Sequence, residues 1–239
     1  MTKIKLCGLS RPQDIEAANA LAPDYIGFVF AEKSRRYVTP ERARELRKLL
    51  KPGIAAVGVF VDAEPESVAG LLREGIIDIA QLHGAEDEVY IRRLRELTDR
   101  PIIKAFRLGD AAAGQEKTEK TVEGSAGTPA AVTKQDDFST AQEEVLRAAA
   151  ASSADIVLLD SGAGTGMVLN WERLAERKFP REYILAGGLT PENVGEAIRS
   201  LHPMGVDVSS GIESEKVKDE SKMAAFVDAV RDTQEEQSD

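Results

Sequence analysis

The sequence is poor in several residue types that define particular classes of protein. One cysteine among 239 residues excludes an intrachain disulfide framework and a zinc site built from several thiolates. The chain has two histidines, and no His, Asp and Glu residues show metal-ligand spacing, so we expect no metal or other cofactor. No apolar run reaches the roughly 18 residues of a membrane span, and the segment MTKIKLCGLS lacks the apolar stretch of a signal peptide. These features predict a soluble, cytoplasmic protein without membrane contacts.

Positive charge is scarce relative to negative charge. The chain carries 31 Lys and Arg against 41 Asp and Glu, which gives a formal net charge of −10. Non-specific binding of nucleic acid needs a basic surface, so we expect no nucleic-acid partner. Hydrophobic residues still account for 42% of the chain, which is enough to bury a sizeable core at this length.

Short apolar segments alternate with amphipathic ones along most of the chain. The apolar segments are rich in Ile, Val, Leu and Phe, as buried parallel strands are. Strands are predicted at Lys3–Cys7, Tyr25–Phe30, Ala55–Val61, Ile79–His83, Ile102–Leu108, Asp155–Asp160, Tyr183–Ala186 and Val206–Ser209.

Helical patterns separate these strands. Thr39 and Thr190 each precede a proline, as an N-cap residue precedes the first residue of a helix. Ser10 and Gln13 resemble a capping box, which predicts a helix after the first strand. Further helices are predicted at Pro40–Leu50, Pro65–Arg73, Asp87–Leu97, Ala141–Ala151, Trp171–Arg177, Pro191–Leu201 and Lys222–Val230.

Eight strands, each followed by a helix, predict an α/β fold of the (β/α)8 or TIM-barrel type, as one domain over residues 1–239. A doubly wound open sheet is the alternative. It usually has fewer strands, and its Gly-rich dinucleotide fingerprint is missing here, because the first strand is followed by Gly8-Leu9-Ser10-Arg11. We therefore favour the barrel.

Two segments depart from the alternating pattern. Residues 109–140 are rich in Ala, Gly, Thr, Glu and Lys and poor in large apolar residues. They form a long insertion after the fifth strand, on the face of the barrel that carries the active site. This composition favours a disordered, catalytically dispensable decoration over a substrate lid. Residues 231–239 are predicted to be a disordered polar tail.

Reacting groups in barrel enzymes lie at the C-terminal ends of the strands, so those positions supply the candidates. The first strand ends at Cys7, with Lys5 on the same face because side chains alternate along a strand. Gln81 and His83 share one face at the end of the fourth strand, and the sixth strand ends at Asp160. Other polar residues expected at this rim are Lys33, Arg35, Arg36, Lys104 and Asp207.

The loops after the seventh and eighth strands are rich in glycine and serine. These two loops often form a phosphate site in such barrels. Glycines let backbone N–H groups approach a phosphate closely, and serine hydroxyls add donors. The alternative is that the glycines only turn the chain. The paired placement favours a phosphate site, with Gly187, Gly188, Ser209, Ser210 and Gly211 as candidates.

Cys7 and Asp160 each allow two interpretations. A lone cysteine is usually a small buried hydrophobe, but Lys5 lies two residues before Cys7, and a nearby cation lowers the pKa of a thiol. Asp160 could cap its own loop, but it ends an apolar strand, where desolvation raises the pKa of a carboxyl. A base and an acid on opposite sides of one pocket would suit isomerisation by proton transfer. His83 could contact a ligand or pack structurally, and His202, before Pro203, is interpreted as structural.

An ordered set of motifs covers almost the whole chain apart from the insertion and the tail. The motifs lie at Lys5–Gly8, Gly27–Phe30, Lys33–Val38, Gly58–Val61, Gln81–Gly84, Leu158–Asp160, Gly164–Gly166, Ala186–Leu189 and Asp207–Gly211. This set resembles the phosphoribosylanthranilate isomerase family of tryptophan biosynthesis, whose opening motif reads K-[IL]-C-G.

The resemblance implies an Amadori rearrangement of N-(5′-phosphoribosyl)anthranilate to 1-(2-carboxyphenylamino)-1-deoxyribulose 5-phosphate, without a cofactor. By the same resemblance, Cys7 would be the general base, Asp160 the general acid, and Arg36 the partner of the anthranilate carboxylate. The chain would bind a small phosphorylated substrate and exist as a monomer or homodimer. The expected substrate-binding residues are Arg36, His83, Gly187, Gly188, Asp207, Ser209, Ser210 and Gly211.

Some positions depart from the family pattern. A loop that usually reads G-G-[ST]-G has Ala163 at its start, and a following F-D-W reads Leu169-Asn170-Trp171, from which we expect little functional loss. Aminoimidazole-carboxamide ribotide isomerase is an alternative, but it has an Asp where this chain has Cys7. Indole-glycerol-phosphate synthase needs a Lys and Glu set that is not evident. A non-enzymatic phosphoribosyl-ligand sensor is disfavoured because both Cys7 and Asp160 are present.

Overall fold

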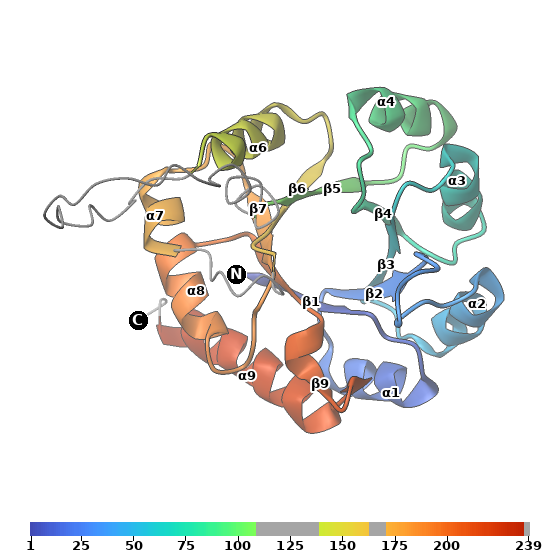
Figure 1. The fold of residues 1–239 in the computed structure, drawn as a ribbon. Helices are drawn as coiled ribbons and strands as arrows, with labels where there is room; N and C mark the ends of the chain where they lie inside the picture. Colours follow the sequence, from blue (N-terminus) through green and yellow to red (C-terminus); the bar gives the residue numbers. More distant parts are fainter. Residues whose placement is uncertain (109–138, 163–170, 237–239) are drawn as a thin grey trace, which may run out of the picture.

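The computed structural model describes residues 1–108, 139–162 and 171–236, without the side chains of 172 and 173. In these ranges, parallel strands close into an eight-stranded barrel surrounded by helices (Figure 1). The barrel closes because β1 pairs with β8 as well as with β2. The predicted (β/α)8 fold is confirmed, and the alternative of an open doubly wound sheet is wrong.

The barrel strands lie within one residue of their predicted bounds. The apolar runs that predict them are buried on both faces, as in parallel sheets generally. The strands are β1 (Lys3–Cys7), β2 (Tyr25–Val29), β3 (Ala55–Phe60), β4 (Ile79–Leu82), β5 (Ile102–Arg107), β6 (Ile156–Asp160), β7 (Tyr183–Ala186) and β8 (Gly205–Val208).

The described helices follow the strands in the expected order. They are α1 (Pro12–Leu21), α2 (Pro40–Leu49), α3 (Pro65–Arg73), α4 (Glu88–Leu97), α6 (Thr140–Ala151), α7 (Trp171–Glu176), α8 (Val194–Leu201) and α9 (Glu220–Glu236). After β8 the chain forms a 3₁₀ turn, η1 (Ser210–Ile212), and a hairpin of β9 (Glu213–Ser214) and β10 (Val217–Lys218). The sequence gives no periodic signal for this hairpin, because its strands are two residues long.

The predicted starts of two helices need correction. Asp14, and not Gln13, caps α1, since its carboxylate accepts hydrogen bonds from the backbone N–H groups of Ser10 and Arg11, both at 2.9 Å. Helix α8 begins at Val194 and not at Pro191, because residues 191–193 form a turn. The predicted N-cap of α2 at Thr39 is confirmed by its side chain, which accepts from the Arg42 N–H.

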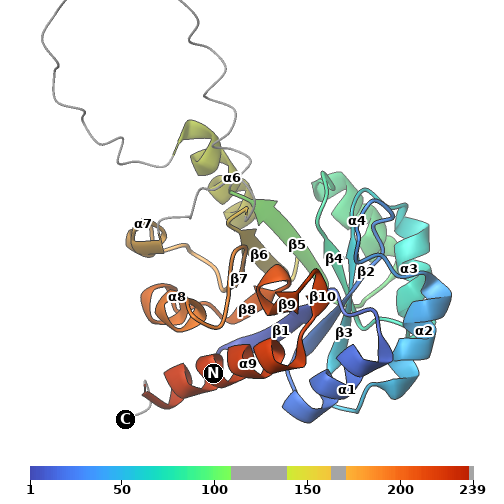
Figure 2. The ribbon, with the colours of Figure 1, turned by 60° about the horizontal axis from the view of Figure 1, so that its bottom comes forward.

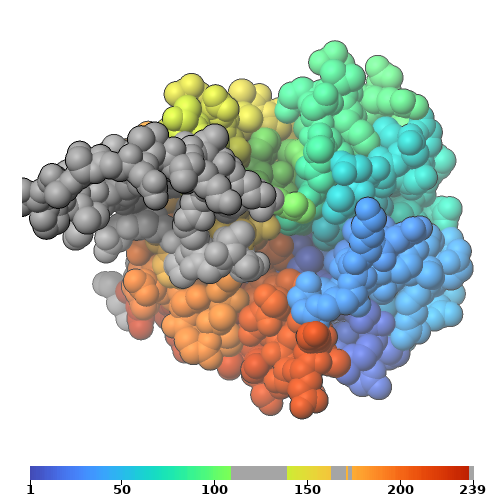
Figure 3. Space-filling model, viewed as in Figure 1, coloured from blue at the N-terminus to red at the C-terminus, as the bar shows by residue number. Residues whose placement is uncertain are grey.

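Helix α9 continues six residues beyond its predicted end at Val230. The predicted tail at 231–239 is therefore wrong up to residue 236. Thr233 is buried, and the Gln234 side chain donates to the Thr2 carbonyl at 2.7 Å, so tertiary contacts hold this polar segment in the helix. Helix α9 packs against α1 and α8 (Figure 2), and the first and last parts of the chain meet at this seam (Figure 3). The predicted insertion at 109–140 lies outside the described residues up to position 138, and α6 begins at Thr140.

Side chains inside the barrel change from apolar to polar along the strands. The layer further from the C-terminal ends of the strands is apolar and contains Val57, Ile79, Ile103, Leu158 and Ile184, among others. Two residues further along β4 comes Gln81, and two residues beyond Leu158 comes Asp160, since alternate residues share a face. This apolar layer therefore forms a floor beneath the polar groups at the C-terminal ends of the strands.

Candidate active site

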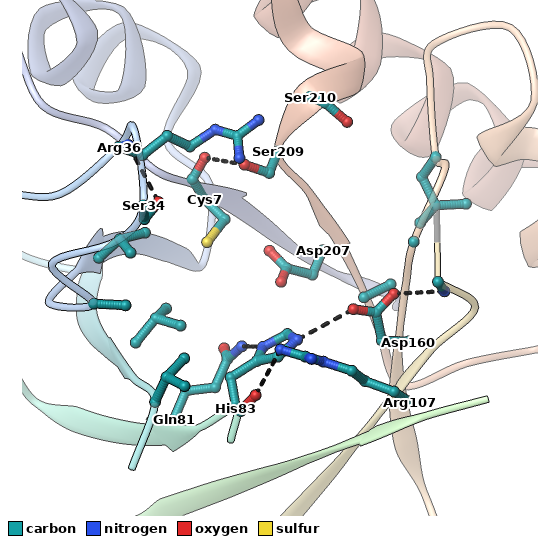
Figure 4. Close-up of a pocket in the computed structure, with 18 of the residues that line it drawn as sticks. Cys7, Ser34, Arg36, Gln81, His83, Arg107, Asp160, Asp207, Ser209 and Ser210 are labelled. Atoms are coloured by element: carbon teal, nitrogen blue, oxygen red, sulfur yellow. Dashed lines mark hydrogen bonds and ion pairs between the residues drawn. The ribbon is translucent and has the colours of Figure 1, made fainter. Parts of the chain in front are cut away.

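A pocket of about 530 Å³ opens at the C-terminal ends of the barrel strands (Figure 4). Both predicted catalytic residues line it, together with all but one of the predicted binding residues. The predicted residues in its wall are Cys7, Arg36, His83, Asp160, Gly187, Gly188, Asp207, Ser209 and Ser210.

Gly211 is not part of this wall. It lies in η1, where a Cβ atom would come within 2.0 Å of the Leu189 carbonyl oxygen. Gly211 therefore lets the loops after β7 and β8 approach each other, and the prediction that it binds substrate receives no support from its position. The serine two residues before it, Ser209, donates its hydroxyl to the Cys7 carbonyl at 3.2 Å and so ties the loop after β8 to β1.

Cys7 lies at the end of β1 above a buried ion pair. Lys5, on the same face of the strand, is 2.9 Å from Asp207 of β8, and both side chains are buried. The thiol fits there because Gly27 is its neighbour on β2, where a Cβ atom would lie 2.7 Å from the Cys7 sulfur. Gly27 thus provides space for the predicted base, a role that the sequence analysis did not identify.

The pKa of the Cys7 thiol is raised and not lowered. Burial is the main cause, and the nearby Asp207 carboxylate adds to it. Lys5 and Lys218 lower the pKa but do not overcome these effects. The sequence-based expectation about Lys5 is wrong in its net result, because burial, with the added effect of Asp207, outweighs the charge of Lys5. The free thiol is consequently protonated at neutral pH.

Asp160, His83 and Gln81 form a chain of hydrogen bonds along one side of the pocket (Figure 4). Asp160 Oδ2 lies 3.1 Å from His83 Nε2, and His83 Nδ1 lies 2.9 Å from Gln81 Nε2. The other Asp160 oxygen accepts from the Gly162 N–H at 2.9 Å. Gly187, with φ of +91°, lets the loop after β7 approach closely, since a Cβ atom there would come within 2.5 Å of Asp160 Oδ1.

The pKa of Asp160 is lowered, contrary to the expectation from its apolar strand. Burial favours the neutral acid, as expected, but hydrogen bonds from His83 and Gly162 outweigh burial, and the charge of Arg107 adds to their effect. The free carboxylate is therefore ionised. Arg107 also donates to the His83 carbonyl at 2.9 Å and lines the pocket. It falls within a predicted strand but was not identified as a site residue.

Arg36 is held by an acidic residue that sequence analysis missed. Glu213 of β9 accepts from Arg36 Nε at 2.6 Å and from Arg36 Nη2 at 3.1 Å. Glu213 also accepts from Arg35, and from Lys218 at 2.9 Å. A signal was available, since Glu213 lies two residues beyond Ser209-Ser210-Gly211, the motif of the predicted phosphate loop. Its partner Arg36, however, is 177 residues away in the chain.

The Glu213 cluster makes a testable contribution to stability. Burial alone would favour the neutral acid, but hydrogen bonds from Arg36, Lys218 and Arg35 lower the pKa of Glu213 to about 2, from 4.5. A lowered carboxyl pKa stabilises the fold above the unfolded value and loses this effect as pH falls through the folded value. We expect Glu213→Gln to lose roughly 1–3 kcal/mol of unfolding free energy at pH 7. Its deficit relative to the wild type should shrink between pH 4.5 and 2. Urea unfolding at several pH values measures this, and a pH-independent deficit would contradict the assignment.

Among the described residues, no three His, Cys, Asp or Glu side chains gather closely enough to hold a metal ion. None of the described helices combines the length and apolar character that crossing a membrane requires.

The fold and the pocket together define a class of protein. A (β/α)8 barrel with a thiol, a carboxyl and an arginine around one pocket at the C-terminal ends of its strands has the architecture of barrel enzymes. The polar groups and the apolar floor suit a small anionic substrate that undergoes proton transfer.

Comparison with known proteins identifies the family. The family model described as N-(5′-phosphoribosyl)anthranilate (PRA) isomerase matches residues 4–125 and 114–229. A relative from Thermoanaerobacter sp. (strain X514) with that enzyme name is 39% identical over 231 residues, covering 97% of this chain and 98% of the relative. This chain belongs to the N-(5′-phosphoribosyl)anthranilate isomerase family, as the sequence motifs predict.

Solved structures agree with this assignment. The phosphoribosyl anthranilate isomerase of Thermotoga maritima superposes with a TM-score of 0.76 at 28% identity, covering 97% of this chain and all of that one. A second structure of such an isomerase, in complex with reduced 1-(o-carboxyphenylamino)-1-deoxyribulose 5-phosphate, gives a TM-score of 0.73 at 29% identity. It covers 97% of this chain and 100% of the other.

Proposed function

We propose that this pocket isomerises N-(5′-phosphoribosyl)anthranilate to 1-(2-carboxyphenylamino)-1-deoxyribulose 5-phosphate, with Asp160 as general acid and Cys7 as general base. The reaction is an Amadori rearrangement in tryptophan biosynthesis. The observation that carries the proposal is the placement of the thiol and the carboxyl in the wall of one pocket, on β1 and β6. Strands one and six are far apart around the barrel, so a substrate between them meets an acid and a base from different directions.

The chemistry needs one proton delivered and one removed. Asp160 gives its proton to the ribose ring oxygen, the bond from C1′ to that oxygen breaks, and the nitrogen lone pair forms an iminium at C1′. The Cys7 thiolate then removes the C2′ proton, and the electrons of that bond neutralise the iminium to give an enolamine. Tautomerisation of the enolamine gives the ketone. Proton transfers of this kind suit positioned side chains without a cofactor.

Without substrate, the proton shared between the proposed base and acid is on the Cys7 thiol and not on the Asp160 carboxyl. The raised pKa of Cys7 keeps the thiol protonated, and the lowered pKa of Asp160 keeps the carboxyl ionised. The reactive form contains the same number of protons, with one shifted from sulfur to the carboxyl. This form is a minor one, and the rate depends on how far the bound state favours it.

Among the described residues, one guanidinium edge of Arg36 has no partner and could take the substrate carboxylate. Glu213 occupies the edge formed by Nε and Nη2, which leaves the edge formed by Nη1 and Nη2 for a bidentate pair. The phosphate would bind at the loops after β7 and β8, on backbone N–H groups of Gly187, Gly188 and Ser210. His83 and Asp207 would contact the ribose portion.

Replacing Arg36 tests the carboxylate contact. We expect Arg36→Ala to lower kcat/KM by on the order of 10²-fold, because a charge-assisted bidentate pair is lost. Arg36→Lys should recover only part of this, since an ammonium group lacks the planar fork. Steady-state kinetics on both variants measure the effect, and full activity in Arg36→Ala would remove this residue from the site.

The function itself is tested with freshly made phosphoribosylanthranilate, whose fluorescence decays as it is consumed. Purified protein should accelerate the decay in proportion to its concentration, and the double variant with Cys7→Ala and Asp160→Asn serves as the matched control. If the wild-type protein accelerates the decay no more than the double variant does, the proposed function is wrong. A cytoplasmic location and the choice between monomer and homodimer remain predictions, and light scattering on the purified protein decides the latter.

A further inference from the structure

Gln81 has a buried oxygen with no partner. The side chain lines the pocket and is 1% exposed, and its Nε2 atom is bonded to His83. Its Oε1 atom has no hydrogen-bond partner among the described residues. An unpaired buried acceptor costs about 1–3 kcal/mol. The amide therefore has one paired end and one unpaired end, and a 180° turn exchanges them.

The orientation of the amide fixes where the protons of its neighbours lie. In the structure the Gln81 NH₂ group donates to His83 Nδ1, so Nδ1 carries no proton. The imidazole proton then lies on Nε2 and points to Asp160 Oδ2, which must act as an acceptor. In this state neither the carboxyl nor the imidazole carries a proton to spare.

Turning the amide by 180° reverses this pattern without moving any other group. Oε1 then accepts a hydrogen bond from a protonated His83 Nδ1, and the NH₂ group takes the place that Oε1 held. His83 Nε2 can now share a proton with Asp160 Oδ2 in either direction. The Asp160–His83 pair thereby holds one proton more than in the observed state.

We propose that Gln81 is a positioning residue for the Asp160–His83 pair. When the pair carries the proton that is delivered to substrate, here called the loaded state, the Gln81 amide is turned so that Oε1 faces His83. The inference rests on the proposed function, because only a general acid needs such a proton. The balance is closed within the pocket: the S–H bond of Cys7 ionises, and one proton is gained by the pair. Because the turn exchanges the paired and unpaired ends of the amide, the two orientations differ in which protonation state of His83 each one matches.

Other charged groups around the pair act on the same equilibrium. Arg107 of β5 donates to the backbone carbonyl of His83. Its charge favours the ionised carboxylate of Asp160 and therefore opposes the gain of a proton by the pair. Cys7 of β1 and Asp207 of β8 also line the pocket, and Asp207 forms an ion pair with Lys5. Gln81 is the uncharged member of this set that contacts His83 directly, so Gln81→Met can alter the pair at constant charge.

The first measurement follows the His83 ring nitrogens by ¹⁵N NMR as a function of pH, and it needs no substrate. The chain has two histidines, so a His202→Asn variant assigns the signals. We expect Gln81→Met, which has no acceptor, to move the His83 midpoint to lower pH by about one unit. Gln81→Glu, which is always an acceptor and adds a negative charge beside the imidazole, should move it upward by more than one unit. Gln234→Met and Gln234→Glu make the same changes at a glutamine in α9 and should leave the midpoint unchanged.

The second measurement uses turnover. Because the reactive form is a minor one, weaker proton binding by the pair reduces its population. We expect Gln81→Met to lower kcat on the order of tenfold and to move the low-pH limb of kcat down by about one unit, with KM within about twofold. Gln81→Glu should move the limb upward. Circular dichroism confirms that each variant is folded.

The opposite directions of the two variants separate positioning from packing, since a packing defect would move both in the same way. Unchanged midpoints, or midpoints and limbs that move together in both variants, would overturn the inference. If the wild-type protein does not isomerise phosphoribosylanthranilate, the proposed function fails instead, and the His83 titration still tests the Gln81 contact by itself.

Discussion

Cys7→Ala is expected to lower kcat by about 10²–10⁴-fold, the usual contribution of a positioned general base. The variant retains the pocket, so its affinity for a product analogue should change by less than about threefold. The analogue is reduced 1-(o-carboxyphenylamino)-1-deoxyribulose 5-phosphate, called the reduced product analogue below. Cys7→Ser should also be poor, because a hydroxyl ionises far less readily than a thiol. Kinetics and calorimetric binding on the same preparations measure the two quantities.

The thiol is buried, so a loss of stability must be separated from a loss of the base. Truncating the small Cys7 side chain should cost about 1 kcal/mol of unfolding free energy, and urea unfolding provides the control. A folded Cys7→Ala variant that turns over at near-native rate would reduce Cys7 to a packing residue and would leave the reaction without its base.

Asp160→Asn is expected to fail comparably, because an amide cannot deliver a proton to the ring oxygen. The change in kcat should again be about 10²–10⁴-fold, with little change in affinity for the analogue. The carboxyl accepts from Gly162 and from His83, and the Asn side chain can retain one of these contacts through its oxygen. The expected defect is therefore chemical and not structural.

Asp160→Glu is the matched comparison for Asp160→Asn. It keeps the acid but moves it by one methylene group, so it should lose activity through misplacement while retaining pH-dependent turnover. Equal and substantial activity in Asp160→Asn and the wild type would assign the acid role to another residue of the pocket.

The fold was predictable from the sequence because its signal is local. Each apolar strand between polar helices reports its own burial, and the bounds of β1 and β7 match the predicted ones. The placement of Cys7 and Asp160 in one pocket followed from the rule that strand ends converge at one rim of a barrel. Site residues whose position depends only on the order of the strands are therefore predictable from the sequence.

The pKa values and side-chain contacts that depend on residues distant in the sequence were not predictable from it. The pKa of Asp160 is lowered in part by His83, 77 residues away, and the guanidinium of Arg36 is held by Glu213, 177 residues away. The hairpin that carries Glu213 has strands of two residues, too short for any periodic pattern. Helix α9 similarly extends past its apolar stripe because tertiary hydrogen bonds hold a polar segment.

The proposed role of Cys7 as the base can be measured directly on the wild-type protein, because Cys7 is its single cysteine. Iodoacetamide should label the protein once. Labelling should become more rapid as pH rises, because the thiolate is the reactive form and burial raises the pKa of the Cys7 thiol. If Cys7 is the base, residual isomerase activity falls in proportion to the labelled fraction seen by mass spectrometry, and bound reduced product analogue slows both labelling and inactivation. Full labelling of Cys7 with activity retained would contradict this role.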